Sequence, residues 1–217
     1  MKYLSNALSD SECESFKKFW QQHEAERAYV NWEEKGKVLD RRLRVLPSDP
    51  EWDIIMRIAS QNFSNIEDIW AAYQSQEFAH NLHIDEYAKE QSLPTYTCVL
   101  SVVTEPKFKT ITWKETDPDN QAMQQKLMNF WDLDPRPAKM SDISQTEDLE
   151  QTPNWNGTYF VDYLNLDGIF SYKKGDGILF NARQYHCTSN WTKYPEFKTR
   201  EFLQIHIVSK DTINLDQ

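Results

Sequence analysis

The sequence predicts a mainly β domain with supporting helices near its amino terminus (α+β), and two observations indicate this class. Short segments rich in β-branched and aromatic residues follow one another from about Ile69, and few helices separate them. Earlier segments instead show the apolar spacing of helices, so we expect helical support over about 1–75. Many short strands with few crossover helices favour an antiparallel sandwich or jelly roll. At 217 residues, we expect one domain over 1–217.

Two helices are predicted in the amino-terminal third. Ser9 followed by Glu12 is a capping-box pattern and predicts a helix over about Asp10–His23. Asp49-Pro50 marks a second helix start, with proline at the first helical position. The apolar positions of the two helices are Phe16, Phe19 and Trp20, then Trp52, Ile55, Met56, Ala59 and Phe63. Between the helices, Val38–Leu46 alternates as a strand does.

Further strands follow, with one long interruption. The predicted strands are Tyr96–Val103, Phe108–Trp113, Thr158–Leu164, Ile169–Tyr172, Gly177–Phe180 and Arg200–Val208. The interruption spans about 115–155, is rich in aspartate and glutamate, and contains one predicted helix at 120–131. A connection of this length inside a compact β domain is usually a lid, a binding loop or disorder, and we interpret it as a lid-like insertion.

Charge and cysteine content exclude several classes of protein. The net charge of −10 argues against a nucleic-acid-binding surface, which needs clustered lysine and arginine. The chain opens without a cationic segment followed by an apolar run, and no stretch approaches membrane-spanning length, so we expect a cytoplasmic protein with no membrane partner. The three cysteines, Cys13, Cys98 and Cys187, are widely spaced, which indicates reduced thiols and neither a disulfide framework nor a zinc ribbon.

A candidate metal site begins with His83-Ile84-Asp85. If this segment is extended, alternation places the His83 and Asp85 side chains on one face. His186 is a third candidate ligand. Two imidazoles and one carboxylate, with the remaining positions open, suit a non-haem Fe(II) site better than a closed structural zinc site. The alternative reading of the isolated motif is a hydrogen-bonded surface pair.

The order of these residues resembles a known superfamily. His83-x-Asp85, a Gly-Asp-Gly turn that leads into a strand (Gly175–Phe180), His186 and Arg200 together are similar to the prolyl-hydroxylase-like Fe(II)- and 2-oxoglutarate-dependent oxygenases. The resemblance covers about 4–208 and implies a double-stranded β-helix (cupin-like). It implies that His83, Asp85 and His186 hold Fe(II) and that Arg200 binds 2-oxoglutarate. The implied reaction uses O2, converts 2-oxoglutarate to succinate and CO2, and hydroxylates a small molecule or peptide.

Arg200 begins an alternating segment in which Phe202, Gln204 and His206 share its face. A guanidinium suits the distal carboxylate of a 2-oxo acid because its planar fork donates two parallel hydrogen bonds. The rival cations are Lys198 and Arg183. Tyr96 is a candidate phenolic partner for the same carboxylate, with a core position as the alternative. Phe202 departs from the small hydroxyl residue often found there in the superfamily, and His206 is expected in packing or in substrate lining.

Two alternatives from other classes remain open at this point. One is a cupin-like metal-dependent enzyme that does not use 2-oxoglutarate. The other is a non-catalytic β-sandwich that binds a partner through the acidic insertion. The sequence predicts neither the substrate nor the oligomeric state.

Overall fold

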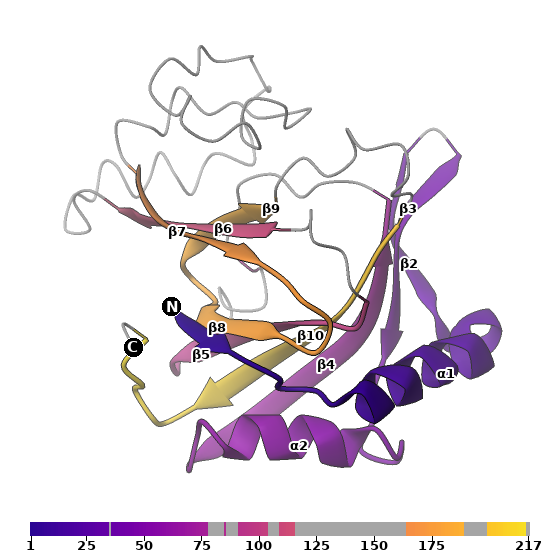
Figure 1. Cartoon of the computed structure of the whole chain (residues 1–217), viewed down its shortest axis with the longest axis horizontal. Coiled ribbons are helices and arrows are strands. Elements are labelled where there is room, and N and C mark those ends of the chain that lie inside the picture. Colours follow the sequence, from indigo (N-terminus) through magenta and orange to yellow (C-terminus); the bar gives the residue numbers. More distant parts are fainter. Residues whose placement is uncertain are drawn as a thin grey trace.

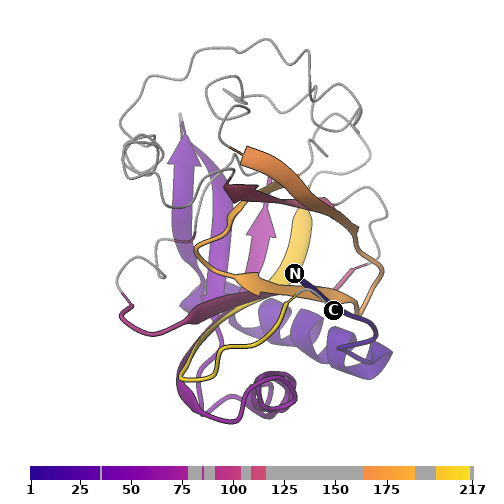
Figure 2. The ribbon, with the colours of Figure 1, turned by 90° about the vertical axis from the view of Figure 1, so that its left-hand side faces the viewer.

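A computed structural model describes residues 1–34, 36–77, 85, 91–103, 109–115, 164–188 and 199–215. The described chain forms three layers (Figure 1). Two helices cover one face of a seven-stranded sheet, and a three-stranded sheet lies over the opposite face. Figure 2 shows the same order of layers after a quarter turn.

The strands pair in an antiparallel manner throughout both described sheets. The large sheet has the order β1-β8-β5-β10-β4-β3-β2, and the small sheet has the order β7-β6-β9. The bounds are β1 Lys2–Leu4, α1 Asp10–Arg27, β2 Tyr29–Glu34, β3 Lys37–Arg44, α2 Trp52–Ser60, β4 Ile66–Gln76, β5 Thr95–Ser101, β6 Lys109–Glu115, β7 Leu164–Ser171, β8 Gly177–Asn181, β9 Tyr185–Thr188 and β10 Arg200–Ser209. The predicted mainly β class with amino-terminal helices is confirmed.

Both predicted helices are present. The Ser9 side chain accepts from the Glu12 amide and the Glu12 carboxylate accepts from the Ser9 amide, so the capping box starts α1 as expected. α1 continues beyond the predicted end at His23 to Arg27. α2 starts at Trp52, after the predicted Asp49-Pro50 start, because the Asp49 carbonyl accepts from Trp52 N (3.0 Å) in a preceding turn.

The predicted strands are largely confirmed, with additions. β3, β5, β6, β7, β8 and β10 overlap predicted ranges, and β4 lies where the extended pattern from about Ile69 begins. β1, β2 and β9 were not predicted. Helical support is therefore an incomplete description of 1–75, because this stretch also contributes four strands to the large sheet. The insertion at 116–155, its predicted helix at 120–131 and most of the predicted strand at 158–164 lie outside the described residues.

Side-chain alternation gives the large sheet two different faces. On β5, Tyr96, Cys98 and Leu100 join the core beneath the helices. Val99 of the same strand packs with apolar residues on the opposite face, and Thr97 shares that face by alternation. The helix side is thus closed by apolar packing, such as the ring contact of Trp20 with Tyr73 at 5.2 Å. The other side, toward the small sheet, also carries polar residues.

The Gly-Asp-Gly turn anchors the amino terminus. The Asp176 carboxylate accepts hydrogen bonds from Tyr3 Oη and from Asn6 N, the latter at 3.0 Å. Gly175 has φ +84°, and a Cβ there would lie 2.3 Å from the carbonyl oxygen of Leu8. Only glycine combines a positive φ with such a close approach to the Leu8 carbonyl without strain. The turn therefore holds β1 against β8, which is a structural role for part of the sequence motif.

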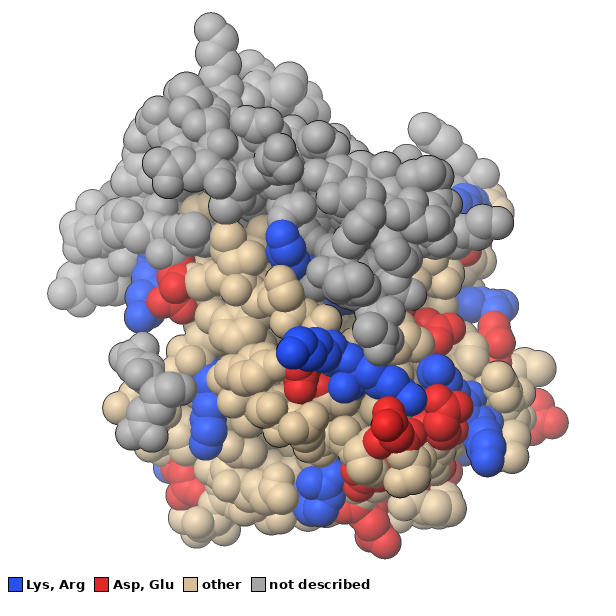
Figure 3. Space-filling view, viewed as in Figure 1, with Lys and Arg blue, Asp and Glu red and all other residues tan. Residues whose placement is uncertain are grey.

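The described surface is mixed in charge. On the face shown in Figure 3, lysine and arginine side chains lie interspersed with aspartate and glutamate. Ion pairs within the described residues include Lys174 with Asp10 (3.0 Å) and Arg57 with Glu12 (2.9 Å). Neither described helix is both long and apolar enough to span a membrane.

Candidate metal centre

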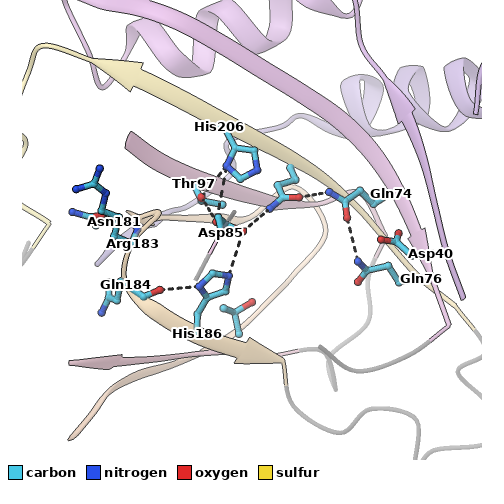
Figure 4. Close-up of polar contacts among 12 residues, drawn as sticks. Asp40, Gln74, Gln76, Asp85, Thr97, Asn181, Arg183, Gln184, His186 and His206 are labelled. Carbon is cyan, nitrogen blue, oxygen red and sulfur yellow. Dashed lines mark hydrogen bonds and ion pairs between the residues drawn. The ribbon is translucent and has the colours of Figure 1, made fainter. Parts of the chain in front are cut away.

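Asp85 and His186 meet between the two sheets (Figure 4). Asp85 is buried, with 7% of its surface exposed, and its backbone N donates to the carbonyl of Ala182 at 3.1 Å. His186 lies on β9 of the small sheet. Its Nε2 is 3.7 Å from Oδ1 of Asp85. The structure therefore brings together two of the three predicted metal ligands.

The His186 ring is oriented by its own strand. Its Nδ1 lies 2.9 Å from the carbonyl oxygen of Gln184. A carbonyl can only accept, so the proton is on Nδ1, and in the neutral ring the lone pair is on Nε2. The Phe180 ring packs at 4.7 Å from the imidazole. His186 thus presents a metal-binding nitrogen toward the Asp85 carboxylate.

His206 approaches the same carboxylate from the large sheet. Its Nδ1 lies 4.0 Å from Oδ2 of Asp85 and 3.1 Å from Oγ1 of Thr97. Burial lowers the pKa of His206, and this effect outweighs the attraction of Asp85, which raises it. From the sequence, His206 was expected in packing or in substrate lining. The structure instead places it beside a predicted metal ligand, with its ring 5.2 Å from that of Trp70.

A row of glutamines leads away from Asp85 along the large sheet. Gln204 Nε2 donates to Oδ1 of Asp85 at 3.5 Å, Gln74 Nε2 donates to Gln204 Oε1, and Gln76 Nε2 donates to Gln74 Oε1 at 3.1 Å. Gln74 and Gln76 are fully buried. Of the three glutamines, only Gln204 was placed on this face from the sequence. Gln74 and Gln76 reach it through the pairing of β4 with β10, which the sequence did not predict.

The described donor atoms fit a divalent metal. Metal–nitrogen and metal–oxygen bonds in zinc sites are roughly 2.0–2.2 Å, so two donors that share one ion lie within about 4.3 Å of each other. The 3.7 Å between His186 Nε2 and Asp85 Oδ1 meets this limit. No group of three histidine, cysteine, aspartate or glutamate side chains within the described ranges could hold a metal. The predicted third ligand, His83, lies outside these ranges.

Arg200 occupies a buried aromatic setting on the same face. Its guanidinium carbon lies 4.4 Å from the ring centroid of Phe202 and 5.6 Å from that of Tyr172. Burial lowers the pKa of Arg200, and Tyr172 partly offsets this, but arginine stays charged at such sites. Burial also raises the pKa of Tyr172 to about 12, so this residue is a neutral phenol.

Two of the other predicted cosubstrate residues lie away from Arg200. Arg183 is exposed and its Nη2 donates to the carbonyl of Gln91 at 2.6 Å. Tyr96 lies on the helix-facing side of β5, where its Oη donates to the carbonyl of Asp211 at 3.2 Å and its ring contacts Phe63 at 4.8 Å. The structure therefore does not bring Tyr96 to Arg200. Lys198 lies outside the described residues.

Tyr172 is the phenol that the structure places beside Arg200. Its Oη is within hydrogen-bond distance, 2.8 Å, of Oγ1 of Thr110 on β6. Tyr172 therefore contacts both the small sheet and the guanidinium of Arg200. Sequence reasoning assigned Tyr172 only to the end of a strand. No sequence pattern around Tyr172 predicts that it lies beside Arg200, because the two residues belong to separate segments of the chain.

Comparisons with known proteins find similarity in structure alone. No family model and no curated protein sequence matches the chain. Among solved structures, the non-haem α-ketoglutarate-dependent carbocyclase SnoK of nogalamycin biosynthesis has a TM-score of 0.60 and 13% identity, with 96% of this chain and 80% of SnoK covered. The epimerase SnoN, in complex with Fe3+, α-ketoglutarate and nogalamycin RO, has a TM-score of 0.53 and 12% identity, covering 95% and 78%. A prolyl-4-hydroxylase from Pseudomonas putida has a TM-score of 0.51 and 9% identity, covering 96% and 91%.

The chain has the fold of the non-haem iron, 2-oxoglutarate-dependent oxygenases. The double-stranded β-helix implied by the sequence resemblance is confirmed at this level. Asp85 and His186 come from different segments and meet between the sheets. Arg200, from a third segment, packs on Phe202 and Tyr172 on the same face of the large sheet. The likeness establishes the fold alone.

Proposed function

We propose that this protein is an Fe(II)- and 2-oxoglutarate-dependent dioxygenase that hydroxylates a small molecule or a peptide. The observation that carries the proposal is the approach of His186 Nε2 to Asp85 Oδ1 at 3.7 Å in a buried position between the sheets. A buried carboxylate and a buried imidazole at this separation can bind one metal ion together.

In this proposal, Asp85 and His186 hold iron together with His83. The carboxylate supplies a negative charge and the imidazoles supply neutral nitrogen donors, a set that leaves coordination positions open. Bound iron and 2-oxoglutarate would supply the oxidation, in which O2 and 2-oxoglutarate would yield succinate and CO2 while a substrate C–H becomes C–OH.

Arg200 would bind the distal carboxylate of 2-oxoglutarate. Its guanidinium is buried, and a carboxylate is the anion whose geometry matches the paired N–H groups. Tyr172 is neutral and lies close enough to share in this contact. The Phe202 and Tyr172 rings place apolar surface beside the guanidinium, and low local polarity strengthens ionic hydrogen bonds.

The proposed substrate is a small molecule or a peptide, and a solved structure of similar fold favours the small molecule. The SnoN structure contains nogalamycin RO, which favours a small molecule for this chain. The solved structures similar to this chain are named as a carbocyclase, an epimerase and a prolyl-4-hydroxylase. Enzymes with this fold therefore catalyse several different reactions. We propose hydroxylation because it is the simplest reaction of an iron centre that has a carboxylate ligand. Asp85 would occupy the coordination position that related halogenases leave free for chloride.

The test is an anaerobic titration with Fe(II) and 2-oxoglutarate that follows the visible charge-transfer absorption of the chelate, and then succinate release after O2 is admitted. We expect a saturable band in the wild type and no band in Asp85→Ala and His186→Ala. The controls are Asp53→Ala, which removes an exposed carboxylate on α2, and His23→Ala on α1. A wild type that gives neither the band nor succinate, or an unchanged band in Asp85→Ala, would refute the proposal. Metal binding without the band would favour a cupin-like metalloprotein.

A further inference from the structure

Both oxygens of the Asp85 carboxylate accept hydrogen bonds from the large sheet. Thr97, on β5, donates from Oγ1 to Oδ2, and Gln204, on β10, donates from Nε2 to Oδ1 at 3.5 Å. Thr97 is fully buried and Gln204 is 9% exposed. Because β5 and β10 are paired neighbours in the sheet, the two donors have a common rigid base.

The direction of the proton at Thr97 follows from counting donors. An ionised carboxylate cannot donate, so the single hydroxyl proton of Thr97 goes to Asp85. Thr97 Oγ1 must then accept from His206 Nδ1, which lies 3.1 Å away. The hydroxyl is thereby held from both sides and cannot rotate away from Asp85 without the loss of two hydrogen bonds.

Gln204 is oriented in a similar way. Its Oε1 accepts from Gln74, and Gln74 Oε1 accepts from Gln76 at 3.1 Å. With its oxygen engaged toward β4, the amide of Gln204 must direct its NH2 group to the other side, where Asp85 lies. The row of amides therefore determines which end of Gln204 faces the carboxylate.

We propose that Thr97 and Gln204 are positioning residues that orient Asp85 for metal binding. Thr97 occupies Oδ2, so that Oδ1, the oxygen facing His186, is the one presented to the ion. Both donors are neutral, so they hold the carboxylate without cancelling the charge that a divalent ion requires. This inference rests on the proposed function, since it takes Asp85 as a ligand.

The test measures Mn(II) binding, with the electron paramagnetic resonance signal of unbound Mn(II) as the readout. Partners of this kind typically change metal affinity by roughly 10- to 100-fold. We expect Thr97→Val to weaken binding by about 10-fold or more, and Thr97→Ser, which keeps the hydroxyl, to restore it to within about 3-fold. The matched control is Thr95→Val, on the same face of the same strand, whose hydroxyl donates to the Leu93 carbonyl at 3.2 Å.

A second variant keeps the test decisive if Thr97→Val does not fold. Gln204→Met retains the length of the side chain and removes the donor, and we expect it also to weaken Mn(II) binding by about 10-fold. Normal affinity in Thr97→Val or Gln204→Met would overturn the positioning role of that residue. Loss of affinity in Thr97→Ser equal to that in Thr97→Val would overturn the role of the hydroxyl.

Asp85→Ala separates this inference from the proposed function. If Asp85→Ala abolishes Mn(II) binding while Thr97→Val and Gln204→Met leave it intact, the positioning inference fails and the metal site stands. If Asp85→Ala binds as the wild type does, the metal site itself fails, and the positioning inference falls with it.

Discussion

The guanidinium of Arg200 lies over the ring of Phe202, with 4.4 Å between the guanidinium carbon and the ring centroid. The aromatic face stabilises the cation. We expect Arg200→Lys to raise the dissociation constant for 2-oxoglutarate by roughly 10- to 100-fold, because lysine loses the paired donors and the stacking. Anaerobic titration of the charge-transfer band would measure this change.

The matched control for Arg200 is Arg183→Lys. Arg183 is exposed and donates to the Gln91 carbonyl, so its substitution should leave 2-oxoglutarate affinity unchanged. If Arg200→Lys kept normal affinity, another cation such as Lys198 would have to bind the cosubstrate.

His206 offers a spectroscopic prediction for the metal-free protein. Burial lowers its pKa, so we expect its ring to take up a second proton only at a lower pH than a free imidazole does. The proton should reside on Nδ1, because Thr97 Oγ1 accepts there. Nitrogen-15 chemical shifts would report both properties, and His206→Gln would assign the signals. A neutral ring with its proton on Nε2 would contradict the hydrogen-bond directions inferred around Asp85, and a midpoint at or above that of free imidazole would contradict the effect of burial.

Gly175 and Gly36 form a natural pair for a stability experiment. Both have positive φ, +84° and +78°, but a Cβ at Gly175 would lie 2.3 Å from Leu8 O whereas one at Gly36 would meet nothing within 4 Å. Gly36→Ala should lower the free energy of unfolding by about 1–2 kcal/mol through the backbone alone. Gly175→Ala should lower it by more, since it adds the clash. Urea denaturation would compare them, and equal losses would argue against close packing of the amino-terminal segment on the turn.

Tyr3 should make stability depend on alkaline pH. Burial raises its pKa to about 12, with added contributions from the hydrogen bond to Asp176 and from the negative charge of that carboxylate. In the unfolded chain the phenol has a pKa of about 10, so the unfolded state loses the proton first. The stabilisation is therefore complete below pH about 10 and is lost as pH rises toward about 12. Tyr3→Phe should flatten this part of the stability profile, and an unchanged alkaline profile would count against the Tyr3–Asp176 contact.

Local patterns predicted much of the fold because their physical causes lie within a few residues. The capping box at Ser9 and Glu12 satisfies helix amides without help from elsewhere, and it started α1 where expected. Alternation likewise predicted that Arg200, Phe202, Gln204 and His206 share one face, and their contacts agree. Short strands such as β1 and β9 carry too few residues for alternation to be recognised.

Alternation leaves two questions open, and tertiary packing answers both. It separates Tyr96 from Thr97 without saying which of them faces inward; the helices pack on the Tyr96 side, so Thr97 meets Asp85. It also cannot say which strands become neighbours, since pairing depends on segments far apart in the chain. The approach of Tyr172 to Arg200 and of Gln74 to Gln204 arose only when the sheets assembled, because such contacts depend on the register and stacking of whole strands.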